Sequence, residues 1–167
     1  DFSTEHPTFF SNDILEQYSN LVVIKSISKS YGVPGLRLGI LATSNAMLMT
    51  NLRRSVSIWN INSFAEFFLQ ILGKYERPYQ QAMDDFRAER ERFVKELQAI
   101  EYLRIIPSEA NYLLCEVLPP HTPRELAIQL LKTHNILIKD CTSKCHAPYI
   151  RIAVRDTNDN NQLIAAL

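Results

Sequence analysis

The chain has 167 residues, of which 46% are hydrophobic and 22% charged, and its 18 basic residues balance its 18 acidic ones. This is a globular composition, and the balanced charge gives no support for binding to nucleic acid or to an acidic membrane surface. We expect no membrane helix, since no run approaches the roughly 18 apolar residues that one needs, and no signal peptide. Only three cysteines are present, which favours a reducing compartment, so the predicted location is the cytoplasm.

The N-terminal part of the chain is predicted to alternate between short helices and short strands. Ser11 or Asn12 can cap the first helix and Ser44 a later one, because their side-chain oxygens accept hydrogen bonds from free helical N–H groups. The apolar run 21–24 predicts a short buried strand of a mostly parallel sheet. The predicted elements are, in order, a helix over 13–18, strands over 21–26 and 36–43, and helices over 45–54 and 63–74.

A long amphipathic helix is predicted over 78–100. Apolar side chains recur there at spacings of three, four and seven residues, and the alternating charges between them predict a solvated face. The remainder predicts a small α/β layer. Its expected elements are strands over 102–107, 111–117, 136–139 and 149–155, a helix over 123–135 capped by Thr122, and a last helix to Leu167 capped by Asp156 or Thr157.

The loop between the first two strands carries the chemistry. Residues 26–39 read Ser-Ile-Ser-Lys-Ser-Tyr-Gly-Val-Pro-Gly-Leu-Arg-Leu-Gly. Serine hydroxyls can donate to phosphate oxygens, Arg37 can hold a phosphate dianion through two parallel bonds, and the glycines let main-chain N–H groups approach closely. Lys29, expected to lie among cations and partly desolvated, could form a Schiff base with an aldehyde. The loop therefore predicts an anion site beside an amine nucleophile.

This loop resembles the cofactor-lysine motif of class I/II aminotransferases, which are enzymes that bind pyridoxal 5'-phosphate (PLP). The shared pattern is Ser-x-Ser-Lys-x-x-Gly-x-x-Gly-Leu-Arg-x-Gly, and the nearest patterns are those of histidinol-phosphate aminotransferase and threonine-phosphate decarboxylase. The resemblance implies that Lys29 is catalytic and forms the Schiff base with PLP. It also implies that Ser26, Ser28 and Arg37 bind the cofactor phosphate.

Three further segments resemble substrate-binding parts of the same family. The strand 149–155 alternates, and its Arg151 matches the family arginine that binds the substrate carboxylate; the alternative is a solvent-facing arginine on an edge strand. Lys139 stands where an arginine often contacts substrate phosphate or carboxylate, and it keeps the charge without the bidentate fork. Asn111 matches an asparagine near bound substrate, or else is only a turn residue.

The resemblance also implies an organisation. The fold class is α/β, the C-terminal part of a fold-type-I PLP transferase: residues 1–77 end the large cofactor domain, and 78–167 form the interdomain helix and the small domain. Since the chain opens at Asp1 without a methionine and its cofactor strand comes early, we expect the C-terminal half of a longer enzyme. The family forms homodimers with sites at the interface, so a homodimer is expected.

The predicted function is a PLP-dependent aminotransferase with a small-molecule amino donor and a 2-oxoacid acceptor. Amino phosphates, aminophosphonates and aromatic amino acids all remain open as substrates. The alternatives are a threonine-phosphate-decarboxylase-like enzyme, the transaminase half of a nucleotidyltransferase fusion, and a non-catalytic anion-binding domain. The segment Trp59-Asn60-Ile61-Asn62 either lies near the active site and dimer interface, as in the family, or merely caps the following helix.

Metal binding is not expected. Cys141, Cys145 and His146 cluster in the sequence, with Cys115 elsewhere. Their spacing is loose for zinc, and free cysteines are commonly buried as small hydrophobic residues.

Overall fold

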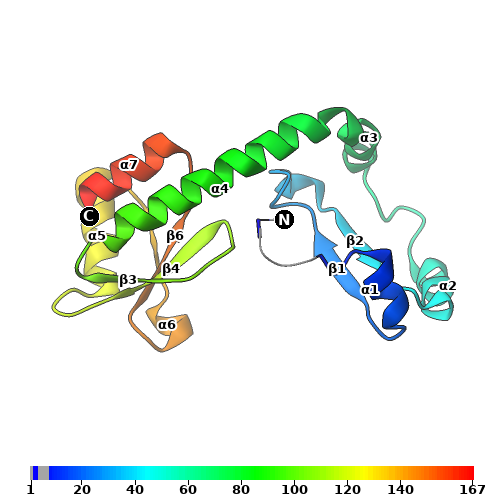
Figure 1. Ribbon diagram of the computed structural model, residues 1–167, viewed down its shortest axis with the longest axis horizontal. Coiled ribbons are helices and arrows are strands. Elements are labelled where there is room, and N and C mark those ends of the chain that lie inside the picture. Colours follow the sequence, from blue (N-terminus) through cyan, green and yellow to red (C-terminus); the bar gives the residue numbers. More distant parts are fainter. Residues whose placement is uncertain (1, 4–7) are drawn as a thin grey trace. The chain divides into compact units, whose positions relative to one another are not determined.

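The computed structural model describes residues 2, 3 and 8–167 (Figure 1). The chain divides into two units, a first that reaches to Gln80 and a second that comprises Gln81–Leu167 together with Phe2 and Ser3. Helices and sheets are mixed in both units, which confirms the α/β class.

The first unit contains short elements whose helices begin at polar caps. Its elements are α1 (Asn12–Gln17), β1 (Val23–Ser26), the 3-10 turn η1 (Pro34–Leu36), β2 (Gly39–Ala42), α2 (Ala46–Ser55), α3 (Ser63–Leu72) and the 3-10 turn η2 (Gly73–Tyr75). Ser11 caps α1, as one of the two predicted alternatives had it. Asn45 caps α2, so the prediction of Ser44 was wrong: the Asn45 Oδ1 accepts from the Leu48 N–H at 2.9 Å. Asn62 caps α3 in the same way.

The two strands of the first unit pair antiparallel, from Val23 opposite Ala42 to Ser26 opposite Gly39. The expectation of a buried strand in a mostly parallel sheet was therefore wrong for β1, in which Ile24 is 75% exposed. A parallel pair needs a long crossover, whereas the turns within residues 27–38 return the chain directly alongside β1. In a two-stranded ladder successive side chains alternate between two faces, so half of them stay open to solvent.

A small core lies beneath the loop between β1 and β2. Ile27, Leu38 and Ala65 are buried there, and Tyr31, Leu36 and Phe68 pack against them. Since Ala65 and Phe68 come from α3, this core joins the start of that helix to the loop that carries Lys29.

Helix α4 (Glu76–Gln98) begins two residues before the predicted Pro78, which therefore lies in the first turn, where its missing N–H leaves no gap in the hydrogen bonding. Met83, Phe93 and Leu97 are buried on its apolar stripe, as predicted. Arg90 is also buried, so the charged positions do not all form a solvated face. Its guanidinium donates to the Phe2 and Ala110 carbonyls, both at 3.2 Å.

The second unit is a four-stranded antiparallel sheet, and α4 lies along one of its faces (Figure 1). Its strands are β3 (Leu103–Ile106), β4 (Tyr112–Val117), β5 (Lys139–Asp140) and β6 (Tyr149–Ala153), in the order β3-β4-β6-β5. Its helices after α4 are α5 (Pro123–His134), α6 (Thr142–Cys145) and α7 (Thr157–Ala166). The prediction missed α6 and placed β5 too early, because its apolar run precedes the two residues that pair with β6.

The main core fills the space between this sheet and its helices. Phe93 and Leu97 of α4, Leu130 of α5 and Leu163 of α7 pack there with Ile150 and Ile152 of β6, which are 0% and 1% exposed. The predicted alternation of β6 is confirmed. Its other face, with Arg151, is exposed.

Over residues 2, 3 and 8–167, no helix is long and apolar enough to span a bilayer.

Candidate functional site

The predicted cofactor residues all lie in residues 26–39, the connecting end of the β1–β2 hairpin, which we call the hairpin mouth. Ser26 ends β1 opposite Gly39, and the Ile27 N–H donates to the Leu38 carbonyl at 3.4 Å. Ser28 and Lys29 follow β1 in the turn, and Arg37 stands between η1 and β2, so the predicted cofactor residues lie at the end of β1 and in its connection to β2.

A tight turn presents Lys29 beyond the end of β1. The Gly32 N–H donates to the Lys29 carbonyl at 3.2 Å, and the Val33 N–H donates to the Ser28 carbonyl at 3.0 Å. Gly32 has a φ of 64°, which only a residue without a Cβ adopts readily. The Lys29 side chain is exposed, so the partial desolvation that we expected is not found among the described residues; a side chain at the tip of a turn projects away from the ladder.

Arg37 follows η1 and precedes β2, and its backbone is in a left-handed conformation, with φ 55° and ψ 38°. Its side chain is exposed, and its Nη1 donates to the Pro34 carbonyl at 3.4 Å. Among residues 2, 3 and 8–167 this long bond is the only one that the guanidinium makes, so its other donors are open to an anion there.

Two aromatic contacts fix Tyr31, which lies in the turn after Lys29. The Tyr31 ring stacks on Tyr79 with centroids 4.3 Å apart and an interplanar angle of 12°. It also meets Phe68 edge-on at 6.1 Å. Such pairs stabilise by about 0.5–1.5 kcal/mol beyond the area they bury, so they hold Tyr31, two residues after Lys29, in place.

The donor set of the hairpin mouth fits a phosphorylated aldehyde. The segment 26–39 contains serine hydroxyls, a guanidinium and a primary amine, and no acidic residue. Hydroxyl and guanidinium donors match phosphate oxygens, and a lysine amine reacts with an aldehyde. PLP carries both groups.

Two cations of the second unit stand directly opposite each other. Lys139 of β5 pairs in register with Arg151 of β6, and both side chains are exposed on the face away from the core. Like charges directly opposite across a ladder destabilise it, and an anion between them would offset that repulsion. A cavity of about 500 Å³ is lined by both cations with Leu137, Ile138, Asp140 and Ala153.

Arg151 is not on an edge strand, because β6 lies between β4 and β5. Its guanidinium carbon lies 5.2 Å from the centre of the Tyr112 ring, a cation–π contact that fixes the direction of the side chain. The neighbouring Asp140 accepts hydrogen bonds from the side chain and the N–H of Thr142, which lower the pKa of its carboxyl. Asp140 is thus bound to the start of α6 while Lys139 and Arg151 share the open face.

Asn111 directly precedes β4, at the end of a hydrogen-bonded turn that begins at Ser108. Its carbonyl accepts from the Val154 N–H at 3.1 Å, just after β6. The Ser108 Oγ donates to the Tyr112 carbonyl at 2.8 Å and accepts from the Ala110 N–H at 3.1 Å. Asn111 therefore lies in the second unit with Lys139 and Arg151, whereas Ser26, Ser28, Lys29 and Arg37 lie in the first.

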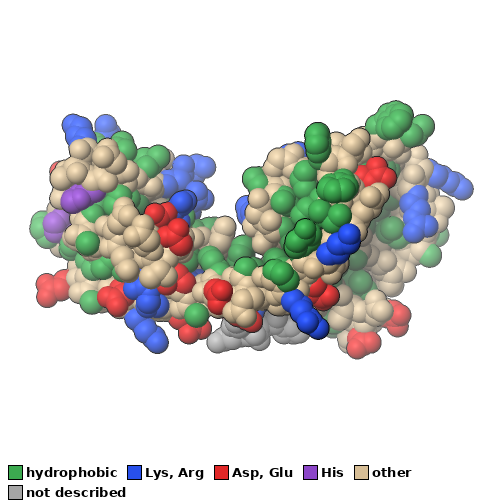
Figure 2. Space-filling view, turned by 90° about the horizontal axis from the view of Figure 1, so that it is seen from above, with side chains coloured by type: hydrophobic (Ala, Val, Ile, Leu, Met, Phe, Trp, Pro, Cys, Tyr) green, Lys and Arg blue, Asp and Glu red, His purple; other side chains and the backbone are tan. Residues whose placement is uncertain are grey.

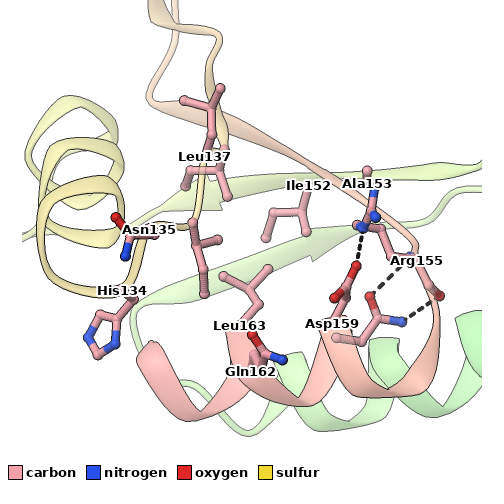
Figure 3. A pocket seen from close by; sticks show the side chains of 12 residues that line it. His134, Asn135, Leu137, Ile152, Ala153, Arg155, Asp159, Gln162 and Leu163 are labelled. Carbon is pink, nitrogen blue, oxygen red and sulfur yellow. Dashed lines mark hydrogen bonds and ion pairs between the residues drawn. The ribbon is translucent and has the colours of Figure 1, made fainter.

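A second cavity of the same unit, of about 380 Å³, lies between the end of α5, β6 and α7 (Figure 3). His134, Leu137, Ile152, Arg155 and Asp159 are among its lining residues. Its charged groups are paired with each other, since Arg155 and Asp159 form an ion pair. This cavity therefore offers an anion less than the one beside Lys139 and Arg151.

The contact of Tyr112 with Arg151 was not predicted from the sequence, nor was the burial of Arg90, whose guanidinium donates to the Ala110 carbonyl next to Asn111. Arg90 falls on the apolar stripe, seven residues after Met83, and that spacing was a usable signal for burial. Tyr112 gave no such signal, because its contact with Arg151 depends on the pairing of β4 with β6.

The described residues hold no group of three or more histidine, cysteine, aspartate or glutamate side chains that could bind a metal ion. Cys115 and Cys141 are buried and free, and Cys145 is exposed.

A family model matches the whole chain, and known proteins match most of it. The sequence model of the family described as "Aminotransferase class I and II" matches residues 1–167. "CMP-5'-(3-aminopropyl)phosphonate synthase" of Streptomyces rubellomurinus is 34% identical over 92% of this chain and 25% of its own length. "Threonine-phosphate decarboxylase" of Salmonella typhimurium is 32% identical over 92% of this chain and 42% of its own length.

A solved structure of an aminotransferase is also similar to this chain. The histidinol-phosphate aminotransferase of Clostridium acetobutylicum matches with a TM-score of 0.83 and 28% identity, over 92% of this chain and 46% of that one. The chain thus spans less than half the length of each of these three proteins. That the match falls on their C-terminal half stays a prediction.

Proposed function

Because the chain belongs to the class I and II aminotransferases, a PLP-dependent family, we propose that it supplies the cofactor lysine and a substrate-anion site of an aminotransferase. The proposed reaction passes an amino group from an amino acid or amino phosphate to a 2-oxoacid. The observation that carries this proposal is the connection between β1 and β2, where the Ile27–Leu38 bond closes the ladder and the segment that follows contains Ser28, Lys29 and Arg37.

In this proposal Ser26, Ser28 and Arg37 bind the cofactor phosphate, and Lys29 holds the aldehyde end. When bound, PLP supplies an aldehyde for the substrate amine and a ring that withdraws electrons from a bond at the substrate Cα. The Lys29 amine acts as the base that takes the proton from the substrate Cα and later returns a proton. Serine hydroxyls and a guanidinium suit the phosphate because they donate without reacting.

The substrate anion binds at the second unit. Arg151 orients the carboxylate through two parallel bonds, and the Tyr112 ring keeps its guanidinium in place. Lys139 provides a second positive charge in the same cavity, as a point charge for a phosphate or second carboxylate. Asn111 is the proposed neutral contact to substrate. In this organisation residues 1–77 belong to the cofactor domain and 78–167 to the interdomain helix and small domain.

Decarboxylation is the second candidate. It is favoured by the relative named threonine-phosphate decarboxylase and by the two adjacent cations, which could hold a phosphate and leave the carboxylate bond free to break. The relative named as a CMP-5'-(3-aminopropyl)phosphonate synthase, of which the chain covers only 25%, keeps a fusion with a nucleotidyltransferase as a further alternative. A domain that binds anions without catalysis is the least favoured alternative.

Borohydride reduction of the full-length protein with PLP tests the cofactor proposal. We expect one modified peptide, at Lys29, and none in a Lys29→Ala variant. Lys74→Ala changes an exposed lysine of the same unit and serves as the control. Modification at another lysine, or at none, would contradict the proposal.

Product analysis separates the two candidate reactions. An aminotransferase forms product from amino phosphates only when a 2-oxoacid is present, and Arg151→Lys should raise the KM for the amino substrate. A decarboxylase releases carbon dioxide and an amine without any acceptor. Formation of an amine product in the absence of a 2-oxoacid would identify the enzyme as a decarboxylase.

We also propose a homodimer in the cytoplasm. Ile58, Trp59 and Phe64 are 91%, 90% and 78% exposed, and Figure 2 shows hydrophobic side chains (green) gathered on the surface of the first unit, at the right. Exposed apolar patches of this kind mark interfaces. The buried free cysteines Cys115 and Cys141 fit a reducing compartment. Sedimentation of the full-length protein and of Trp59→Ser tests the dimer, which the substitution should weaken.

A further inference from the structure

Asn62 makes two different hydrogen bonds with its one side chain. Its Oδ1 accepts from the Ala65 N–H at 2.9 Å, which caps α3. Its Nδ2 donates to the Leu36 carbonyl at 3.0 Å, across 26 positions of the sequence. The first bond accounts for a cap; the second reaches into the loop that carries the candidate phosphate site.

The Leu36 carbonyl belongs to the peptide plane that precedes Arg37. The φ of Arg37 is the rotation about its N–Cα bond relative to that peptide plane, and it is 55°. A residue with a Cβ is disfavoured in this left-handed region, so it persists where the surroundings hold it. The Asn62 amide binds the carbonyl of the peptide plane from which this rotation is measured, and it therefore helps to fix the backbone that carries the Arg37 side chain.

Packing supports the same link. Ala65, whose N–H Asn62 caps, is fully buried, and Leu36 packs against the same small core. The first turn of α3 and the Arg37 loop thus share one core and one bridging side chain.

Asn45 offers a natural comparison. It caps α2 through a bond of 2.9 Å from its Oδ1 to the Leu48 N–H, the geometry that Asn62 has at α3. A cap needs only the side-chain oxygen, and serine provides one about as well as asparagine. The amide donor of Asn62 is therefore separable from its capping role.

We propose that Asn62 is a positioning residue for phosphate recognition: through the Leu36 carbonyl it holds Arg37 in the conformation that directs its guanidinium to the cofactor phosphate. This inference rests on the proposed function, in which Arg37 binds that phosphate. Its effect is confined to ligands that carry the phosphate group.

The test compares PLP with pyridoxal, which lacks the phosphate, on the full-length protein freed of cofactor. Asn62→Ser keeps a capping oxygen but is too short to reach the Leu36 carbonyl, and Asn45→Ser is the matched control. We expect Asn62→Ser to weaken PLP binding about three- to tenfold, since one hydrogen bond is lost, and to leave pyridoxal binding unchanged. Asn45→Ser should change neither affinity. Asn62→Asp, which also caps but cannot donate, should lose PLP affinity as Asn62→Ser does.

Three results bear on the inference. Equal PLP affinity in Asn62→Ser and Asn45→Ser would overturn it, and so would an equal loss of PLP and pyridoxal affinity, which indicates general damage to the loop. Loss of PLP affinity alone supports it. Failure of the proposed function is a separate observation, because it appears in the unsubstituted protein as an absence of PLP binding or of label at Lys29.

Discussion

Lowering the pH should decrease the unfolding free energy of the second unit through one carboxylate, that of Glu89 in α4. Its carboxylate accepts hydrogen bonds from Arg92 at 2.8 and 3.0 Å, from Asn160 at 2.7 Å and from Thr157 at 2.8 Å, and only 13% of its side chain is exposed. These bonds, with Arg92 foremost, lower the pKa of Glu89 from 4.5 to about 2. They join α4 to the first turn of α7, so they are lost when the unit unfolds.

The sign follows from proton linkage. Because the folded pKa lies below the unfolded one, the stabilisation is complete above pH 4.5 and is lost as the pH falls toward 2. Between pH 6 and pH 3 the two pKa values give a loss of about 2 kcal/mol in unfolding free energy as an upper figure. Solvent screens the partly exposed Glu89–Arg92 ion pair, which reduces the expected loss of unfolding free energy to about 1 kcal/mol.

Amide hydrogen exchange of the full-length protein measures this loss. The amides of 93–97 lie in the most buried turns of α4, so they report unfolding of the unit after correction for the intrinsic pH dependence of exchange. We expect their unfolding free energy to fall by about 1–2 kcal/mol more in the unsubstituted protein than in Glu89→Gln between pH 6 and pH 3. Glu91→Gln, at an exposed position of the same helix, is the control and should behave as the unsubstituted protein. Equal pH dependence with and without Glu89 would refute the reasoning.

Three further predictions concern the loop, the anion site and the cysteines. Gly32→Ala forces a Cβ into the left-handed region and should cost about 1–2 kcal/mol in loop stability, which faster proteolysis between Ser28 and Arg37 would reveal; unchanged cleavage would contradict the strain. Tyr112→Leu should raise the KM for the anionic substrate with little change in kcat, because Arg151 loses its aromatic support; a pure kcat effect would speak against this role. Burial raises the pKa of Cys115 to about 12, so at pH 8 iodoacetamide should alkylate the exposed Cys145 and leave Cys115 unmodified until the protein is unfolded, as peptide mass spectrometry can show.

Local patterns were enough for much of this chain. Thr122 followed by Pro123, and Asp156 before α7, place helix starts correctly because a cap needs only its own side chain and the next turn. The alternation of β6 likewise identifies its buried face, since the period of a strand is a local property. The Ser-Lys-Gly-Arg pattern of residues 26–39 was specific enough to indicate the family.

What depended on partners distant in sequence was not predictable. The antiparallel pairing of β1 with β2, the two carbonyl partners of Arg90, and the second bond of Asn62 each require a group that only folding brings near. The same holds for Lys139 and Arg151, whose facing position follows from strand register. Residue order thus indicated most helix caps, although Asn45 and not Ser44 caps α2, and it determined the buried face of β6 and the chemical groups that are available. Tertiary structure alone decided which of those groups meet, because contact energies depend on distances in space that sequence separation does not specify.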